Sequence, residues 1–171
     1  YYRFFGEWKT YNSLGGKAVI RDFYPCLNDR TSETVVDPQY FYQAAWMVSV
    51  IGAYKPNKHV DVGSEVNFVG ILSTLFPVTF VDIRPLRLKL PQLECVDGSI
   101  LALPYGNGTL ESLSSLHVIE HIGLGRYGDA LDPDGSEKAC IELSRVLAPR
   151  GRLYVSIPIG TPRVKFNGLR V

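Results

Sequence analysis

Three aspartates stand at regular intervals in the middle of the chain. Asp61 lies two residues before Gly63, Asp82 comes nineteen positions after that glycine, and Asp97 is fifteen further on. An acidic residue about 20 positions after a glycine turn suits a ribose, because one carboxylate can accept hydrogen bonds from both hydroxyls of a vicinal diol. Asp97, followed by the small Gly98, could accept a hydrogen bond from the exocyclic amine of adenine. The spacing therefore predicts a nucleoside-type pocket.

The turn at Gly63 joins a predicted strand, His59–Val62, to a predicted helix over 66–76. A strand that enters a helix through glycine presents backbone N–H groups to a nucleotide. The dinucleotide fingerprint is incomplete, because Glu65 and Asn67 stand where small, flexible residues are expected. An NAD-type dehydrogenase is the poorer interpretation, since the backbone cannot easily approach a pyrophosphate. Asp61, Asp82 and Asp97 would surround the pocket with negative charge. Such a pocket repels an anionic pyrophosphate and tolerates a sulfonium cation.

A second group of reactive residues is the string His117-x-x-Glu120-His121. Zinc peptidases carry an H-x-x-E-H pattern on a helix. Two histidines at this spacing share a metal only if the backbone is helical, whereas here the string ends a predicted strand and runs into a glycine-rich loop. The chain has 3 His and offers no obvious third ligand. We therefore expect no metal site, and a pocket-lining or fold-stabilising role for Glu120 and His121.

The loop over 123–135 is rich in glycine and aspartate. A calcium loop registered on Asp132 and Asp134 lacks a carboxylate at its first and twelfth positions, so a solvated turn is the better interpretation. Three other side chains of the loop could position or deprotonate an acceptor, or only order the loop: Arg126, Tyr127 and Asp129.

These residues are positioned by a regular alternation of predicted strands and helices. Strands are expected over 59–62, 79–83, 93–96, 112–118 and 152–157, and helices over 37–54, 66–76 and 136–147, with a helical turn near 99–103. Asp37-Pro38 is a typical helix start, and Ser136 is a plausible cap for the last helix. Short connections between alternating elements favour a doubly wound α/β fold with a parallel sheet, whose carboxyl edge binds ligands.

Length and composition place the chain among globular proteins with one main domain. Residues 1–36 are aromatic and turn-rich, and we expect an N-terminal extension or lid, with a short strand over 17–24, before a domain over 37–171. Lys+Arg 18 against Asp+Glu 17 leaves a net charge of +1, and no basic run is present, so neither nucleic acid nor a membrane surface is an expected partner. No apolar run approaches the ~18 residues of a membrane helix.

The three cysteines indicate a compartment. Cys26, Cys95 and Cys140 are far apart, so buried free thiols in a reducing, cytoplasmic environment are expected. No signal peptide opens the chain. The chain starts without methionine and stops abruptly at Val171, which is typical of a fragment or a trimmed sequence.

Five phrases of the chain resemble, in their order and spacing, those of class I S-adenosylmethionine-dependent methyltransferases. They are His59-Val-Asp-Val-Gly63, Phe80-Val-Asp-Ile83, the run 97–105, Ser115-Leu-His-Val-Ile-Glu-His121 and the run 143–158. More narrowly, the phrases over 120–129 and 166–170 resemble a bacterial family of unknown function within that superfamily.

The resemblance implies a Rossmann-like sheet of strand order 3-2-1-4-5, S-adenosylmethionine as cofactor and a small-molecule acceptor methylated on oxygen or nitrogen. The cofactor residues that it implies are Asp61 and Gly63 on the methionine side, Asp82 for the ribose, Ile83 beside the adenine, Asp97 and Gly98 at the adenine edge, and His117 on the methyl-transfer face. His117 and His121 are the candidate general bases, useful if the acceptor is a hydroxyl.

The chain also departs from the family pattern. Glu65 and Asn67 replace small residues, Leu110-Glu111 replaces a common Phe-Asp, and strands 6 and 7 of the family are not accounted for, so the chain is either truncated or a minimal five-stranded version. The alternative function is a catalytically degenerate binding or scaffold domain. It predicts a crevice filled by Glu65 or by the aromatic N-terminal segment. The sequence does not indicate an oligomeric state.

Overall fold

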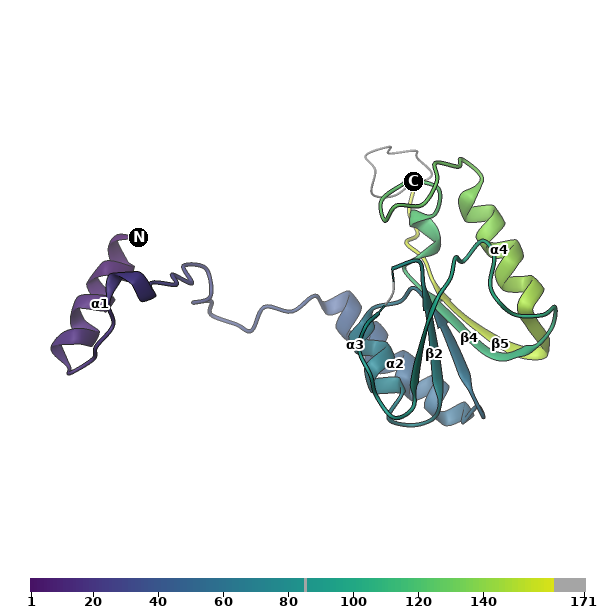
Figure 1. The fold of residues 1–171 in the computed structure, drawn as a ribbon, viewed down its shortest axis with the longest axis horizontal. Coiled ribbons are helices and arrows are strands. Elements are labelled where there is room, and N and C mark those ends of the chain that lie inside the picture. The colour runs from purple at the N-terminus through teal and green to yellow at the C-terminus, as the bar shows by residue number, and fades with distance from the viewer. Residues whose placement is uncertain (85, 162–171) are drawn as a thin grey trace. The chain divides into compact units, whose positions relative to one another are not determined.

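A computed structural model describes residues 1–84 and 86–161 of the chain (Figure 1). It divides the chain into two compact units, Tyr1–Phe41 and Tyr42–Val171. The sequence phrase over 166–170 lies outside the described residues.

The first unit is a small aromatic cluster on a helix. Helix α1, Tyr2–Ser13, places Phe4 and Trp8 one turn apart, where both rings meet Phe23 edge-on at centroid distances of 4.9 and 5.3 Å. Trp8 Nε1 donates a hydrogen bond of 2.8 Å to the carbonyl of Ala18. Aromatic residues at helical spacing thus form a helix that the sequence analysis did not predict.

The predicted strand over 17–24 is wrong. This stretch holds a single 3-10 turn, Ile20–Asp22. The side chain of Asn12 binds the backbone of Ala18 on both sides, accepting from its N–H at 3.1 Å and donating to its carbonyl at 3.0 Å. Those backbone groups are therefore not free to pair with a neighbouring strand.

The second unit is a five-stranded parallel sheet of order β3-β2-β1-β4-β5, which confirms the predicted fold class. Its strands are β1 His59–Val62, β2 Val78–Asp82, β3 Leu93–Asp97, β4 Leu110–Leu116 and β5 Leu147–Ser156. Because all pairs are parallel, the carboxyl ends of all five strands meet at one edge of the sheet.

Helices cover both faces of this sheet (Figure 1). On one face, α2 Pro38–Tyr54 and α3 Val66–Leu72 bury Met47, Ile51, Phe68, Leu72, Phe80 and Leu116. On the other face, α4 Gly135–Val146 buries Val60, Val62, Val81, Leu113, Leu143 and Val146. Alternate residues of each strand thus serve opposite cores, as expected for a sheet covered on both sides.

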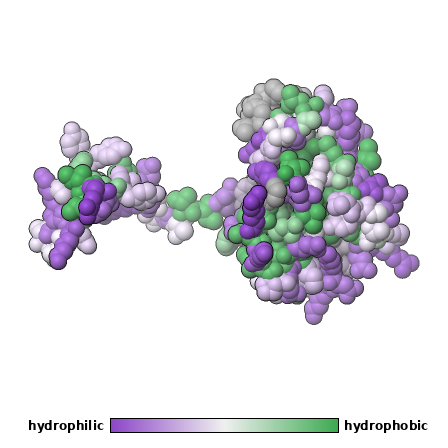
Figure 2. All heavy atoms as spheres, in the orientation of Figure 1, coloured by the Kyte–Doolittle hydropathy of each residue, from purple (hydrophilic) through white to green (hydrophobic). Residues whose placement is uncertain are grey.

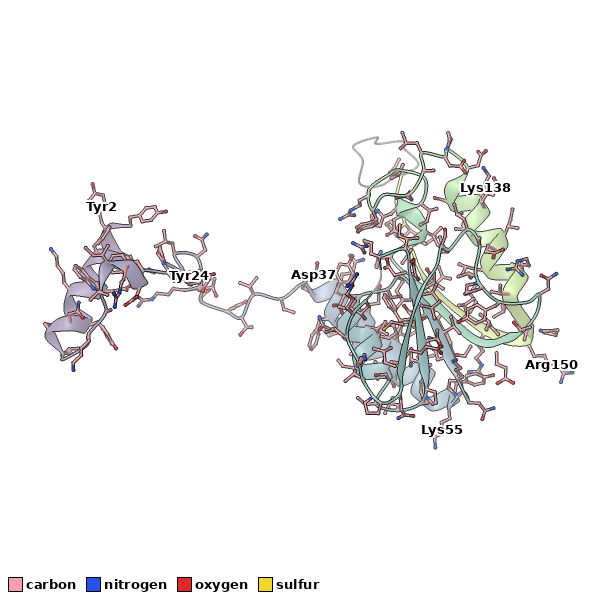
Figure 3. The ribbon with its side chains drawn as sticks, in the orientation of Figure 1. Tyr2, Tyr24, Asp37, Lys55, Lys138 and Arg150 are labelled. Carbon is pink, nitrogen blue, oxygen red and sulfur yellow. The ribbon has the colours of Figure 1, made fainter. Side chains whose placement is uncertain are left out.

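Helix α2 begins as the sequence predicts. Asp37 Oδ1 accepts hydrogen bonds from the N–H groups of Gln39 at 2.9 Å and Tyr40 at 3.3 Å, and so caps the helix (Figure 3). The helix is followed by Lys55, whose φ of 53° is left-handed and ends the regular backbone.

Several predicted boundaries differ from the structure. The helix predicted over 66–76 ends at Leu72, the strand predicted over 79–83 runs one residue earlier, and β4 begins and ends two residues before its prediction. The helical turn expected near 99–103 is a tight turn closed by an antiparallel bridge between Ser99 and Ala102. Such short segments carry too little periodicity to fix their ends.

The cap of α4 also differs. Asp134 is the N-cap of this helix, whereas Ser136 donates its hydroxyl to the carbonyl of Ile119 at 2.8 Å. Strand β5 starts at Leu147, five residues before the strand predicted over 152–157, and it includes the Pro149–Gly151 segment. The pairing of β5 with β4 shifts register between Leu110 and Ser112, which lets the strand pass through this segment.

The three cysteines do not lie in the core. Cys26 and Cys140 are exposed and Cys95 is half-buried, so the predicted burial of the free thiols is wrong. Figure 2 shows polar residues, in purple, spread over the visible face of the second unit, with smaller hydrophobic areas in green between them. Among the described residues, no helix has both the length and the apolar character needed to cross a membrane.

Candidate functional site

A cavity of about 90 Å³ lies at the carboxyl edge of the sheet. Its walls come from the segments that follow four strands: Gly63 after β1, 82–84 at the end of β2, 98–101 after β3, and His117 with Val118 after β4. Tyr127 and Asp129 complete the lining from the loop before α4. The cavity therefore lies where open α/β sheets bind their ligands.

The structure brings together most of the residues that the sequence analysis singled out. Five of them line the cavity: Gly63, Asp82, Ile83, Gly98 and His117. Three do not: Asp61, Asp97 and His121.

Two glycines shape the walls because a side chain would not fit. Gly63 has a φ of 70°, and a Cβ there would lie 3.1 Å from Val118 Cγ1. A Cβ on Gly98 would lie 2.9 Å from Val81 Cγ1. Both positions therefore need glycine for the segments after β1 and β3 to pack closely against their neighbours.

Asp82 holds its carboxylate at the edge of the cavity. Its Oδ1 accepts a hydrogen bond of 2.7 Å from the N–H of Arg84 and lies 3.4 Å from Arg84 Nε. The Asp82 side chain is 11% exposed and that of Arg84 is 58% exposed. Arg84 therefore orients the Asp82 carboxylate, which remains in the cavity lining.

Asp61 lies behind the glycine turn, where it is fully buried. It accepts hydrogen bonds from the N–H of Ser64 at 3.1 Å, from Ser64 Oγ at 2.7 Å and from Ser114 Oγ. Burial raises the pKa of Asp61 to about 6, although these hydrogen bonds act in the opposite direction. Asp61 thus shapes the turn from within and does not line the cavity.

A buried histidine continues this network. His59 Nδ1 lies 2.7 Å from Ser112 Oγ, and His59 Nε2 lies 2.8 Å from Ser114 Oγ. Burial lowers the pKa of His59 to about 3, so the ring is neutral. Sequence reasoning missed this network. The signal was the alternation of Ser112 and Ser114 on β4, facing His59 and Asp61 on β1.

Glu65, whose presence weakened the glycine fingerprint, caps a helix. Its carboxylate accepts hydrogen bonds of 3.0 Å from the N–H groups of Asn67 and Phe68 in the first turn of α3. Glu65 is exposed and does not line the cavity. Asp97, at the end of β3, is also exposed and does not line the cavity. Residues 98–101, which follow it, line the cavity instead.

His117 and Glu120 form a buried pair after β4. His117 Nδ1 lies 3.0 Å from Glu120 Oε1, and their side chains are 9% and 7% exposed. Glu120 belongs to the 3-10 turn Ile119–His121. Within the described part of the chain, Glu120 Oε2 is buried without a hydrogen-bond partner. His117 itself has a φ of 54°, a left-handed backbone that is rare for residues other than glycine.

The loop over 123–129 is ordered by Asp129. Its Oδ2 accepts from the N–H groups of Gly123 at 2.8 Å and Gly125 at 3.2 Å, and its Oδ1 accepts from Tyr127 N–H at 3.3 Å. Burial opposes ionisation, but these backbone groups hold the pKa of Asp129 below its usual value. Of the two roles that the sequence left open, the ordering of the loop is the one these contacts support.

The Tyr127 ring makes cation–π contacts with two arginines. Arg84 Cζ lies 4.1 Å from the centre of its ring and Arg126 Cζ lies 4.9 Å from it. Arg126 Nη1 also lies 3.2 Å from His121 Nε2, and the His121 ring meets Tyr127 edge-on. His121 therefore supports the loop wall from behind and is 5% exposed.

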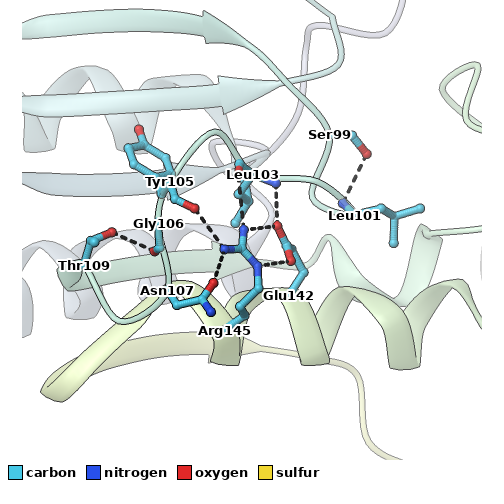
Figure 4. A network of polar contacts seen from close by, with 9 residues as sticks. All are labelled: Ser99, Leu101, Leu103, Tyr105, Gly106, Asn107, Thr109, Glu142 and Arg145. Carbon is cyan, nitrogen blue, oxygen red and sulfur yellow. Dashed lines mark hydrogen bonds and ion pairs between the residues drawn. The ribbon is translucent and has the colours of Figure 1, made fainter.

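Helix α4 fixes the connection between β3 and β4 (Figure 4). The Arg145 guanidinium binds both carboxylate oxygens of Glu142, at 2.7 and 2.6 Å, and donates to the carbonyls of Leu103 at 3.3 Å and Tyr105 at 3.0 Å. Glu142 Oε1 in turn accepts from the N–H of Leu103 at 2.6 Å. The hydrogen bond to Arg145 lowers the pKa of Glu142. This network holds the connection just beyond the cavity wall formed by Leu101.

No group of three or more metal-ligating side chains occurs among the residues that the structure describes. The functional groups in the cavity lining are the carboxylates of Asp82 and Asp129, the imidazole of His117, the guanidinium of Arg84 and the phenol of Tyr127.

Comparisons with known proteins agree with this architecture. Residues 90–171 match a family described as "Caenorhabditis protein of unknown function, DUF268". No curated protein matches the chain. The YcgJ protein of Bacillus subtilis is similar with a TM-score of 0.51 at 15% identity, over 67% of this chain and 50% of that one. The PH0226 protein of Pyrococcus horikoshii OT3 gives 0.50 at 19% identity, over 70% and 58%.

The fold is a Rossmann-like, doubly wound α/β fold, which this chain shares with these two solved structures. A putative sarcosine dimethylglycine methyltransferase from Galdieria sulphuraria is also similar, with a TM-score of 0.48 and 18% identity, over 68% of this chain and 44% of that one. The chain spans about half the length of the solved structures that it matches.

Proposed function

We propose that this protein is an S-adenosylmethionine-dependent methyltransferase acting on an oxygen or nitrogen of a small molecule. The observation that carries the proposal is the convergence of the segments after four neighbouring strands on one cavity, with the Asp82 carboxylate and the Gly63 turn both in its lining. The sequence resemblance to class I methyltransferases, which spans the same strand ends, supports the proposal.

The residues of the site fit this cofactor. Asp82 offers a carboxylate to the hydroxyls of a ribose, and Ile83, Ile100 and Leu101 offer apolar contacts to a base. Gly63 has no side chain, so the turn after β1 can pack closely against Val118 at the cavity wall. The cavity of about 90 Å³ is smaller than a nucleoside, so the ligand would extend beyond it. Because Tyr127 and Asp129 line the cavity, an outward movement of their loop would enlarge the site.

When bound, this cofactor supplies an electrophilic methyl group on a sulfonium. The chain's own part in the reaction is to position the acceptor and to exclude water, which is how enzymes lower the barrier to such displacements. The apolar walls and the Tyr127 loop would exclude water, and Asp82 would fix the orientation of the nucleoside. The small-molecule acceptor is what the sequence resemblance implies.

The alternative of a degenerate scaffold domain is not favoured. It requires the crevice to be filled by side chains such as that of Glu65. The Glu65 carboxylate is instead engaged by the first turn of α3 and lies outside the cavity lining.

Titration calorimetry of the full chain with S-adenosylmethionine tests the proposal. We expect micromolar binding, weakened about tenfold or more by Asp82→Ala, because a hydrogen bond to a charged group is worth about 1.5–3 kcal/mol. Glu111→Ala, at an exposed position of β4, is the matched control and should leave the affinity unchanged. No heat and no thermal shift at millimolar cofactor would remove the proposal.

A further inference from the structure

The pair His117 and Glu120 is arranged as a carboxylate that orients an imidazole. Glu120 Oε1 lies 3.0 Å from His117 Nδ1, and the two residues are three apart in the chain, His117 directly after β4 and Glu120 in the following 3-10 turn. His117 lines the cavity, whereas Glu120 lies behind it. The carboxylate therefore contacts the imidazole from the side of the protein interior.

This arrangement is unfavourable for stability on two counts. The Glu120 side chain is 93% buried, since 7% of it is exposed, and Oε2 has no hydrogen-bond partner in the described residues. A buried polar atom without a partner destabilises the folded state, because it has lost its hydrogen bonds to water. His117 adds a left-handed backbone, with a φ of 54°. Unfavourable features of this kind are concentrated at functional sites, where the surrounding structure holds them in place.

The other two histidines are used differently. Both ring nitrogens of His59 face serine hydroxyls in the core, and the ring is 0% exposed. His121 stands against Arg126 and Tyr127 in the loop wall. His117, by contrast, lines the cavity and contacts the Glu120 carboxylate.

We propose that Glu120 is a positioning residue for His117, and that His117 takes the proton of a hydroxyl acceptor during methyl transfer. A carboxylate on Nδ1 holds the imidazole with its proton on Nδ1, which leaves Nε2 as the proton-accepting atom. This inference rests on the proposed function and narrows its acceptor from oxygen or nitrogen to the oxygen of a hydroxyl.

The proton and electron count is complete with these groups. The acceptor oxygen forms a bond to the methyl carbon and loses its proton to His117 Nε2. The carbon–sulfur bond breaks, and its electron pair stays on the sulfur, which becomes a neutral thioether. A neutral amine can attack the methyl group without first losing a proton. A hydroxyl is a much weaker nucleophile until a base takes its proton, so a positioned base favours a hydroxyl acceptor.

The test compares two cofactor analogues on the full chain by titration calorimetry. S-Adenosylhomocysteine lacks the methyl group, and sinefungin carries an amine where that group would be. An amine there can donate a hydrogen bond to a base on the transfer face. We therefore expect sinefungin to bind the wild type more tightly than S-adenosylhomocysteine, by about tenfold for one charge-assisted hydrogen bond.

The variants separate positioning from structure. Glu120→Ala should abolish most of the preference for sinefungin and leave the affinity for S-adenosylhomocysteine within about twofold. Glu120→Gln keeps an acceptor for Nδ1–H and should retain much of the preference. Glu111→Ala, an exposed glutamate of β4, should behave as the wild type. An unchanged preference in Glu120→Ala would overturn the inference.

A second measurement needs no variant of Glu120. Nitrogen-15 spectra of the histidine rings report which nitrogen carries the proton, and His117→Gln identifies the signal. We expect neutral His117 to be protonated on Nδ1, and protonation on Nε2 would overturn the inference. Failure of the wild type to bind either analogue would instead refute the proposed function, so the two failures are distinguishable.

Discussion

The guanidinium carbon of Arg84 lies 4.1 Å from the centre of the Tyr127 ring. Arg84 follows β2 and Tyr127 belongs to the loop before α4, so this contact joins two segments about 40 residues apart in the chain. Both residues line the cavity. The contact therefore closes one side of the site, and the loop that carries Tyr127 is the part of the wall whose movement would change the size of the cavity.

Removal of the Tyr127 ring should loosen this loop. We expect Tyr127→Ala to lose about 1 kcal/mol of folding free energy, the typical size of a cation–π contact near the surface, and to speed hydrogen exchange over 123–129. Tyr127→Phe keeps the ring and should exchange as the wild type does. Equal exchange rates in the Ala variant and the wild type would show that Asp129 alone orders the loop.

Arg145→Met should destabilise the second unit, because it leaves the Glu142 carboxylate without its charged partner and removes the contacts to the loop carbonyls. Arg145→Lys should recover little, since an ammonium cannot reproduce the bidentate geometry. Urea unfolding measures both effects.

Arg150→Met is the control for that experiment. Arg150 is exposed on β5 (Figure 3), and its replacement should change the free energy of unfolding by less than about 0.5 kcal/mol. Similar losses for Arg145→Met and Arg150→Met would contradict the role assigned to the network of Figure 4.

The buried pair Asp61 and His59 should give opposing pH dependences. The pKa of Asp61 is raised from 3.8 to about 6, so its contribution to stability is complete below pH 3.8 and is lost as the pH rises through about 6. The pKa of His59 is lowered from 6.5 to about 3, so its contribution is complete above pH 6.5 and is lost as the pH falls through about 3. Between pH 4 and 6 the two effects partly cancel.

Asp61→Asn removes one side of this balance. The stability of the variant relative to the wild type should rise between pH 4 and pH 7 by up to about 3 kcal/mol, since one pKa unit corresponds to about 1.4 kcal/mol. Urea unfolding at pH 4, 5, 6 and 7 measures the difference. A difference that stays constant over this range would mean that Asp61 titrates at its ordinary value in the folded chain.

Two glycines that are close in sequence offer a matched comparison. Gly63→Ala should cost about 1–2 kcal/mol, because an alanine at a φ of 70° is strained and its Cβ would lie 3.1 Å from Val118 Cγ1. Gly70→Ala adds the same methyl group within α3, where no atom lies within 4 Å, and should stabilise the helix by up to about 1 kcal/mol. Thermal unfolding of both variants checks the prediction. Equal shifts would show that backbone conformation does not matter at Gly63.

The sequence by itself determined the order of the elements and the edge at which the site lies. Alternating apolar runs gave strand β1 at His59–Val62 without error, and Asp37-Pro38 marked the start of α2, because period and capping are local properties of the chain. The distance from Gly63 to Asp82 is likewise local to one strand–helix–strand unit, and both residues line the cavity.

Only the tertiary structure decided which polar side chains face the cavity and which are buried behind it. Asp61 and Ser114 are 53 residues apart, and their contact depends on the register of β1 against β4. A change of one residue in register would exchange the faces of every side chain on a strand. The pairing of Glu120 with His117 likewise depends on a left-handed backbone at His117, which no local pattern predicts.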